Sequence, residues 1–239
     1  MNLWQLTAAN ARLISGPLQA QVDLLNPALG LHELAWNDAP IGGNLFGVTV
    51  AEGSIAQMPL STDGMDQFVR GNDLVANYPQ GEAQRFTLHM YWRIAQSAAS
   101  LVVIDAIVSL QTSLLECFPK ALLTTNLPNG EVLAVTGAGS PTVAVTDRLA
   151  SDEPSGVLVR SDGCPWSYLE MTHPADLGCW RVARAHAIQL DRELGGEFQE
   201  KGVIRRLRVR GAFMARENDE EIAAQLIAEF AAAEPPLTA

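Results

Sequence analysis

Residues 85–94, RFTLHMYWRI, and residues 101–110, LVVIDAIVSL, decide the fold of this chain. In the first stretch apolar residues alternate with polar ones, so that His89, Tyr91 and Arg93 share one face. That period of two is typical of a β-strand with one buried face. The second stretch is almost continuously apolar and rich in valine and isoleucine, which favours a strand at the centre of a sheet, covered on both faces.

Further strands are predicted along most of the chain. The segments between them are rich in glycine and proline, as expected of turns. Because about ten strands follow one another without a long helix between them, the pattern favours antiparallel sheets packed in a sandwich. These further strands cover residues 18–24, 45–50, 131–136, 142–146, 156–160, 166–171, 179–190 and 202–215.

One helix is predicted, at residues 219–233. Its apolar residues recur at a spacing of three to four among alanines, which is the pattern of an amphipathic helix. Asn218 or Asp219 can cap its first turn, and Pro235 and Pro236 end it. The sequence therefore predicts an all-β fold, an antiparallel β-sandwich or supersandwich with one C-terminal α-helix, in a single domain over residues 1–239.

The composition excludes several classes of protein. The chain has 239 residues, of which 48% are hydrophobic and 18% charged, and its net charge is −11. That many apolar residues can form a core, which excludes a disordered chain. The negative charge disfavours nucleic acid and anionic membrane surfaces as partners. We expect a cytoplasmic protein, because the sequence has no signal peptide and no run of about 18 apolar residues.

The motifs of common cofactor and metal sites are missing from the sequence. There is no glycine-rich nucleotide-binding loop, no G-x-S-x-G or H-E-x-x-H motif, and no cysteine pair with zinc-ligand spacing. The four histidines are scattered along the chain, so we predict neither a metal nor a cofactor. Cys164 and Cys179 could pair in principle, but we expect them and Cys117 to be structural thiols.

Charge is separated sharply near the C-terminus. Residues 201–216 carry six basic residues and no acid, and residues 217–234 carry six acids and no base. In a strand, Arg206, Arg208 and Arg210 would share one face. Three guanidinium groups can bind an anion or a sugar, or they can pair with neighbouring acids on the surface. We favour the ion pairs because the charges balance, and any anionic ligand would bind at this strand.

Polar residues that folding alone does not explain interrupt several strands. Aromatic rings beside arginine, histidine and carboxylate groups suit a sugar, because ring C–H groups stack on aromatic faces and hydroxyls bond to charged groups. Each such residue could also be structural. We predict that they converge on one sheet face. Ligand-binding roles are assigned to Arg70, His89, Arg93, Trp166, Arg184 and His186, and proton transfer to Glu170 and His173.

Three features make the chain similar to the galactose mutarotase-like β-supersandwich. They are the opening Trp4-Gln5-Leu6, the strand at 18–24 that leads through Pro27 and Gly30 to residues 31–34, LHEL, and the nearly uninterrupted series of strands. The resemblance implies a sugar site on the concave face of the larger sheet, and some members are aldose epimerases with a glutamate base and a histidine acid. The family's Asn-Arg pair and catalytic motifs have no match in this sequence, so Glu170 and His173 are candidates from the residue pattern alone.

Three functions remain in view. We favour a carbohydrate-binding protein that recognises a sugar on a sheet face. The alternatives are an enzyme on the same fold, either an aldose epimerase-like isomerase or a lyase acting on an acidic sugar, and a non-enzymatic protein-interaction module. The oligomeric state is not predicted, because self-association through an edge strand leaves no readable signal in the sequence.

Overall fold

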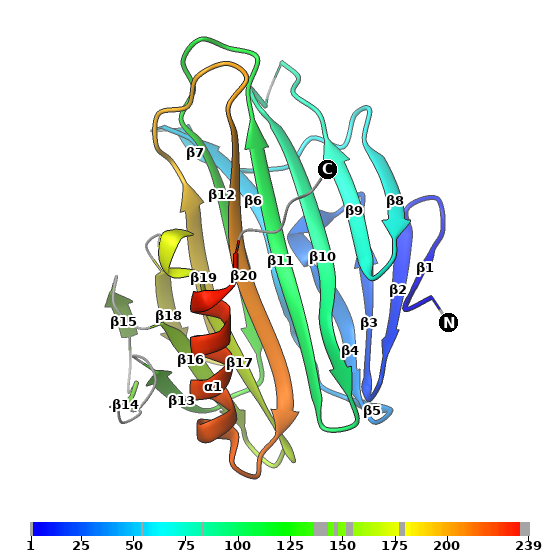
Figure 1. Ribbon diagram of the computed structural model, residues 1–239, viewed down its shortest axis with the longest axis vertical. Helices are drawn as coiled ribbons and strands as arrows, with labels where there is room; N and C mark the ends of the chain where they lie inside the picture. Colours follow the sequence, from blue (N-terminus) through cyan, green and yellow to red (C-terminus); the bar gives the residue numbers. More distant parts are fainter. Residues whose placement is uncertain are drawn as a thin grey trace.

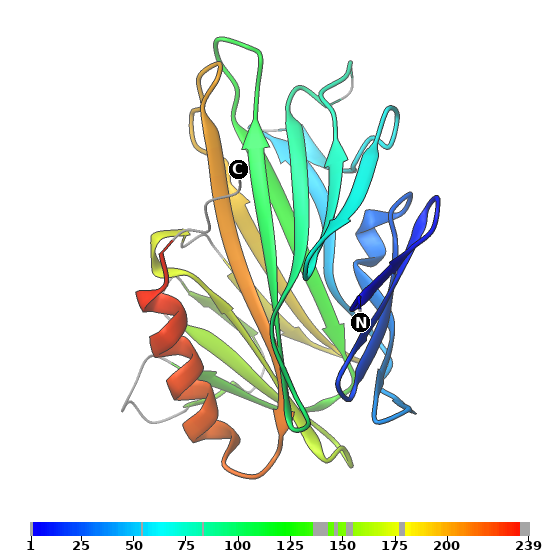
Figure 2. The ribbon, with the colours of Figure 1, turned by 45° about the vertical axis from the view of Figure 1, so that its right-hand side comes forward.

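Two antiparallel β-sheets packed face to face make up most of the structure (Figure 1, Figure 2). The structure is a computed structural model that describes residues 2–53, 55–82, 84–135, 143–145, 148–151, 155–176 and 180–234. Within these residues one sheet has eleven strands and the other has nine.

The strands are numbered in chain order, but neighbours in each sheet are often distant in the chain. From edge to edge, the eleven-stranded sheet contains β1 (Trp4–Leu6), β2 (Asn10–Ser15), β3 (Leu18–Asp23), β4 (Leu31–Trp36), β6 (Asn44–Glu52), β12 (Pro119–Leu127), β19 (Ile188–Gly195), β18 (Trp180–Arg184) and β15 (Arg148–Ser151), with β5 (Ala39–Pro40) beside β4 and β7 (Ile55–Pro59) beside β6. The nine-stranded sheet contains β14 (Val143–Ala144), β13 (Gly130–Val135), β16 (Gly156–Ser161), β17 (Trp166–Thr172), β20 (Ile204–Ala215), β11 (Leu101–Gln111), β10 (Thr87–Ala98), β9 (Asp73–Tyr78) and β8 (Asp66–Arg70). The helical elements are the short η1 (Pro27–Leu29) and η2 (Pro174–Asp176) and the α-helix α1 (Asp219–Ala232).

The predicted all-β sandwich with one C-terminal α-helix is confirmed. The two stretches that decide the fold form β10 and β11, which pair along their whole length within the nine-stranded sheet. As predicted, β11 is covered on both faces: Ala106 and Val108 belong to the core between the sheets, and Val103 packs under α1. The alternation in β10 is also confirmed, since Met90 and Trp92 face the core.

The helix α1 lies on the outer face of the nine-stranded sheet, over the β16, β17 and β20 side (Figure 1). Its apolar side, which includes Phe230, packs on residues of the sheet. Asn218, one of the two expected caps, has a left-handed backbone, with φ 58°, and makes no side-chain cap hydrogen bond. The buried carboxylate of Asp219 instead accepts hydrogen bonds from Arg160 (2.9 and 2.6 Å) and Ser167 (2.5 Å). No helix in the described part of the chain is long and apolar enough to span a membrane.

One strand prediction is wrong. Residues 179–190 were predicted as a single strand, but β18 and β19 are two antiparallel strands joined by a turn at residues 185–187. The pattern concealed the turn because the buried Val182 and Leu190 lie an even number of residues apart, as they would on one face of an unbroken strand. Of the predicted strand at 142–146, the structure describes a strand only at Val143–Ala144.

The cysteines are described in part. Cys117 is buried and Cys164 half-buried, and both are free thiols, as expected of structural cysteines. Cys179 lies outside the described residues.

Candidate functional site

Beside α1, the outer face of the nine-stranded sheet carries side chains in rows that cross five strands. Strand register defines each row, because residues paired across neighbouring strands lie side by side. From β8 to β20, the Arg93 row is Arg70, Asp73, Arg93, Asp105 and Arg210; the Tyr91 row is Phe68, Val75, Tyr91, Ile107 and Arg208; the His89 row is Asp66, Asn77, His89, Ser109 and Arg206. The predicted common face of His89, Tyr91 and Arg93 is therefore confirmed.

The Arg93 row is a series of ion pairs. Arg93 donates to both carboxylate oxygens of Asp73 (2.8 and 2.7 Å), and Arg210 donates to both oxygens of Asp105 (2.6 and 3.0 Å). The Arg210 guanidinium also lies 4.4 Å from the centre of the Phe230 ring, which links the row to α1. Arg93 was predicted to bind ligand, but its guanidinium is committed to Asp73.

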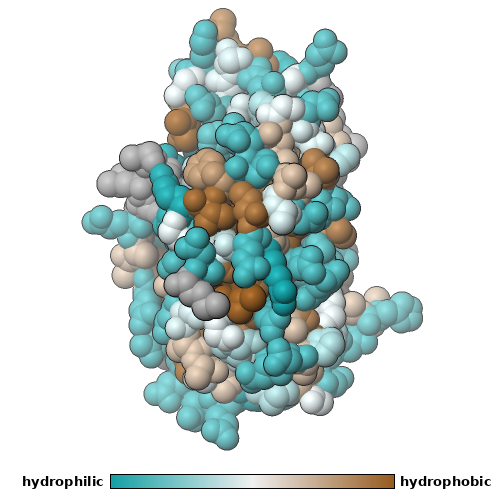
Figure 3. Space-filling view, turned by 90° about the vertical axis from the view of Figure 1, so that its right-hand side faces the viewer, coloured by the Kyte–Doolittle hydropathy of each residue, from teal (hydrophilic) through white to brown (hydrophobic). Residues whose placement is uncertain are grey.

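The Tyr91 row forms an apolar floor. Val75, Tyr91 and Ile107 are buried and pack against one another on this outer face. Phe68, at the β8 end of the row, is 44% exposed and so presents an aromatic ring to solvent. Seen from the side of the molecule on which β8 and β9 lie, hydrophobic side chains gather in the middle of the surface and hydrophilic ones surround them (Figure 3).

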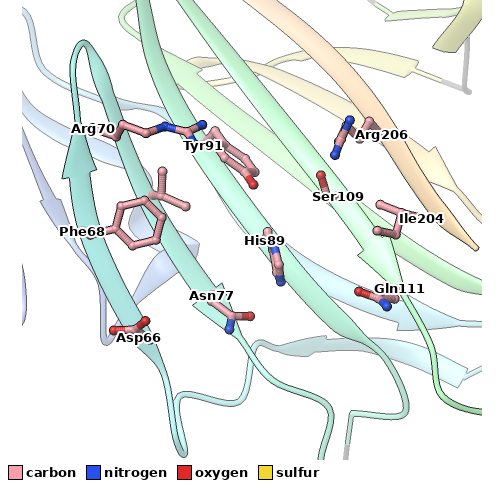
Figure 4. Close-up of a pocket in the computed structure, with 11 residues that line it drawn as sticks. Asp66, Phe68, Arg70, Asn77, His89, Tyr91, Ser109, Gln111, Ile204 and Arg206 are labelled. Atoms are coloured by element: carbon pink, nitrogen blue, oxygen red, sulfur yellow. The ribbon is translucent and has the colours of Figure 1, made fainter. Parts of the chain in front are cut away.

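A cavity of about 310 Å³ lies over the Tyr91 and His89 rows (Figure 4). Arg70 reaches from β8 toward Tyr91, and Arg206 approaches from β20 on the other side, beside Ser109 (Figure 4). Gln111 and the half-exposed Ile204 line the cavity beyond the His89 row. Its size is at the lower end of the range for small-molecule sites, and its lining combines an apolar floor with a few polar groups, as such sites do.

Two oxygen atoms of the His89 row have no hydrogen-bond partner in the described part of the chain. Ser109 Oγ and Asn77 Oδ1 are both buried, and neither has a hydrogen-bond partner among the residues that the structure describes. Most buried polar atoms in folded proteins are hydrogen-bonded, and leaving one unpaired costs about 1–3 kcal/mol. Two such atoms in one row at one cavity suit a ligand that is rich in hydroxyl groups.

The imidazole of His89 lies between these two residues in the row. Burial, and after it the positive charge of Arg206, lowers the pKa of His89 from its ordinary value of 6.5. The ring is therefore mostly uncharged at neutral pH, with one nitrogen that donates a hydrogen bond and one that accepts. A sugar hydroxyl can use both.

A pH-dependent stability follows from His89. Because folding lowers the pKa of His89, this side chain binds a proton below pH 6.5 in the unfolded chain, whereas in the folded chain it stays neutral to a lower pH. The free energy of unfolding should fall as the pH drops from 6.5 to the lowered pKa, and this fall should be smaller in His89→Asn than in the wild type. Urea denaturation at a series of pH values measures it, with the exposed His186→Asn as control. Identical pH profiles for wild type and His89→Asn would contradict the expectation.

The structure does not bring Glu170 and His173 together. They lie three residues apart at β17, so their side chains point to opposite faces of the sheet. His173 lies under the end of α1, where its ring meets Phe230 edge-on at 5.4 Å and its Nδ1 accepts from the Ala175 N–H (3.1 Å). Burial, and after it Arg208, lowers the pKa of His173. The predicted proton-transfer pair is corrected: the two groups do not share a site.

Glu170 belongs to a polar network in the core between the sheets. Its Oε2 accepts from the hydroxyls of Thr125 (2.7 Å) and Tyr168 (2.9 Å), and its Oε1 accepts from Arg192 Nε (3.1 Å). Burial, and after it Glu170, raises the pKa of Tyr168 well above its ordinary value. Trp166 lies on the same inner face and packs edge-on against Phe213. Neither Glu170 nor Trp166 lines the cavity.

The last two predicted ligand-binding residues are also elsewhere. Arg184, in β18, donates to the backbone oxygens of Val145 (2.9 Å) and Gly130 (2.7 Å). His186 is exposed in the turn between β18 and β19. The predicted convergence on one face is therefore wrong: of the eight residues, only Arg70 and His89 line the cavity.

Sequence reasoning did not name Asn77, Ser109 or Phe68 as site residues. The sequence does mark Ser109: it and Asp105 are the two polar residues in the apolar run at 101–110, and their spacing of four puts them on the same face of a strand. For Arg206, the sequence predicted a place on one strand face with Arg208 and Arg210. Arg208 and Arg210 are paired with acids, as favoured: Arg208 with Asp176 (2.9 Å) and Arg210 with Asp105 (2.6 Å).

The chain is similar in fold to the solved structure of a candidate aldose 1-epimerase. No protein-family model matches it, and no curated protein does. A candidate aldose 1-epimerase from Klebsiella pneumoniae has a TM-score of 0.57 and 9% sequence identity, over 96% of this chain and 87% of that chain. A candidate kojibiose phosphorylase from the human microbiome has a TM-score of 0.44 and 7% identity, over 97% of this chain and 33% of that chain. The match to the candidate epimerase confirms the galactose mutarotase-like β-supersandwich as the fold of this chain.

Proposed function

We propose that this protein binds a sugar in the cavity over the Tyr91 and His89 rows. The observation that carries the proposal is a pair of oxygens, Asn77 Oδ1 and Ser109 Oγ, that have no partner among the described residues and lie beside an apolar floor. Asn77, His89 and Ser109 offer hydrogen bonds to hydroxyls, and Tyr91 with the exposed Phe68 offers aromatic surface to ring C–H groups. The likeness of the fold to a candidate aldose 1-epimerase supports a carbohydrate ligand.

A binding role is preferred to a catalytic one. The residues predicted to transfer protons, Glu170 and His173, lie on opposite faces of the sheet, and Glu170 is held by Arg192 in the core. In the cavity itself, Asp66 and His89 occupy different strands with Asn77 between them in the row. The observations therefore support recognition of the sugar, and no reaction step is assigned.

Removing the unpaired oxygens should weaken sugar binding. In Asn77→Ala/Ser109→Ala the sugar loses two hydrogen-bonding groups, and we expect its affinity to fall at least tenfold, about 1.4 kcal/mol. Isothermal titration with a panel of aldoses and small oligosaccharides measures the affinity. Gln96→Ala is the control, because Gln96 is exposed on β10 and lies outside this cavity.

Two results would contradict the proposal. One is wild-type protein that binds no sugar of the panel at millimolar concentration. The other is a sugar that binds the double variant as tightly as it binds the wild type, because its site would then lie elsewhere. Chemical shift changes confined to residues of β8 to β11 and β20 would support the location independently.

A further inference from the structure

A second cavity adjoins the proposed sugar site at the start of β20. It has a volume of about 160 Å³ and is lined mainly by the loop that connects β19 to β20, including Phe198 and the half-exposed Val203. Ile204, the first residue of β20, lines both this cavity and the one over the Tyr91 and His89 rows. The second cavity by itself is smaller than the usual small-molecule site of about 300–1,000 Å³. Its size and position therefore suit an extension of the first cavity.

Each of the two cavities has an exposed aromatic ring. Among the phenylalanine, tyrosine and tryptophan side chains that the structure describes, only Phe68 and Phe198 are exposed. Phe68 lines the first cavity, and Phe198 lines the second and packs against Phe118, with 5.8 Å between the ring centres. The apolar C–H groups of a sugar ring can stack on such a face. The two exposed rings thus offer two places for sugar units, one in each cavity.

Hydrogen bonds hold the loop between β19 and β20, which carries the second ring. The Gln199 N–H donates to Cys117 O (2.8 Å) and the Cys117 N–H donates to Gln199 O (3.2 Å), so this loop lies beside the loop between β11 and β12 at one end of the molecule (Figure 1, Figure 2). The buried amide of Gln199 also donates to the backbone oxygens of Leu110 (2.8 Å) and Val203 (2.7 Å). Because the loop is held before any ligand binds, the ring can bind a sugar with little loss of conformational entropy.

The charged groups of the second cavity compensate each other. Arg205 and Glu197 both line it, and they form an ion pair with one another. A carboxylate in an ion pair still has lone pairs that accept hydrogen bonds from hydroxyl groups. The cavity therefore suits a neutral ligand that combines hydroxyl groups with an apolar ring face.

We propose that the ligand of this protein is a neutral oligosaccharide of at least two sugar units. One unit occupies the cavity over the Tyr91 and His89 rows, where Asn77 and Ser109 bond to its hydroxyl groups. The saccharide continues past Ile204, and its next unit lies against the ring of Phe198 in the second cavity. This inference rests on the proposed sugar site and adds the class of ligand and a second binding subsite.

The test compares monosaccharides with disaccharides on the whole protein by isothermal titration. The probes are D-glucose and D-galactose on one side and maltose, cellobiose and lactose on the other. We expect the wild type to bind one of the disaccharides about fivefold or more tightly than either monosaccharide, because a second unit gains an aromatic contact. Phe198→Ala should reduce this preference to less than about twofold and leave the affinity for the monosaccharides within about twofold of the wild type. Phe198→Trp keeps an aromatic face and should keep the preference.

Leu115→Ala is the matched control. Leu115 belongs to the neighbouring loop between β11 and β12, is 82% exposed and lines neither cavity, so its loss removes an exposed apolar side chain without touching either subsite. Equal affinities of the wild type for monosaccharides and disaccharides, a Phe198→Ala variant that keeps the preference, or a Leu115→Ala variant that loses it would overturn the inference. Chemical shift changes at residues 196–204 that a disaccharide causes and a monosaccharide does not would support it independently.

Failure of this inference is distinguishable from failure of the proposed function. If the disaccharides show no preference but Asn77→Ala/Ser109→Ala weakens the binding of a monosaccharide, the second subsite is wrong and the proposed function stands. Failure of all five sugars to bind the wild type overturns the inference, and failure of the wider panel as well overturns the proposed function.

Discussion

Replacing Glu170 with glutamine is expected to lower the free energy of unfolding by about 3–5 kcal/mol, the usual cost of removing one partner from a buried ion pair. The side chains of Glu170 and Arg192 are 1% and 3% exposed and join β17 of one sheet to β19 of the other. Glutamine keeps the size of the side chain and an oxygen that accepts from Thr125 and Tyr168. It leaves the guanidinium of Arg192 buried without a counter-charge. Urea denaturation followed by tryptophan fluorescence measures the loss.

Two further variants distinguish the cost of breaking a buried ion pair from the cost of removing a carboxylate at any position. Glu193→Gln makes the same change on β19 in a partly exposed group that pairs with Lys120 and Arg181, and should cost about 0–1 kcal/mol. Glu170→Gln/Arg192→Met removes both charges and should recover most of the loss, because no buried charge is left unpaired. Similar small losses in Glu170→Gln and Glu193→Gln would show that the pair is not a buried one.

Strands were predictable where side chains made the burial pattern visible. In β10 and β11 large apolar residues mark the inward positions, so both strands were found from the sequence. β12 is as strictly alternating in burial, but its inward positions include Pro119, Ala121 and Thr125, which carry little hydrophobic signal. In β8 no residue is buried, so its burial pattern gives no signal either. A period of two can be read only where the buried positions are apolar and the exposed ones are not.

The site was less predictable than the fold, for a different reason. Side chains two residues apart in a strand share a face, and this rule correctly placed His89, Tyr91 and Arg93 together. The same rule separates Glu170 from His173, because an odd spacing changes face in a strand. The spacing along one strand does not show which strands are neighbours in the sheet. Arg206 meets the His89 row only because β20 pairs with β11 and β11 with β10, and the first of these pairings joins segments about a hundred residues apart.

Replacing Phe213 with alanine is expected to lower the free energy of unfolding by about 3–5 kcal/mol, as for other buried aromatic residues. Its ring is fully buried and contacts Trp36, Trp166 and Tyr168, at centroid distances of 5.9, 5.3 and 4.9 Å. Trp36 belongs to the eleven-stranded sheet, so the ring joins the two layers, and alanine leaves a cavity between them. Trp166 was predicted to bind ligand, and its position in this cluster makes it a core residue. Thermal and urea denaturation of Phe213→Ala measure the loss.

Phe68→Ala also removes a phenylalanine ring, but from an exposed position instead of the core. Phe68 is 44% exposed at the edge of the cavity, so its loss should change stability by no more than about 0.5 kcal/mol. It should weaken sugar binding by roughly fivefold, since an aromatic contact contributes about 1 kcal/mol. Phe213→Ala should do the reverse: at a temperature where it stays folded, its affinity for the sugar should match that of the wild type, because Phe213 faces the core and not the cavity. A sugar affinity that falls in Phe213→Ala but not in Phe68→Ala would place the binding site between the sheets instead of on the outer face, and would restore Trp166 and Glu170 as site residues.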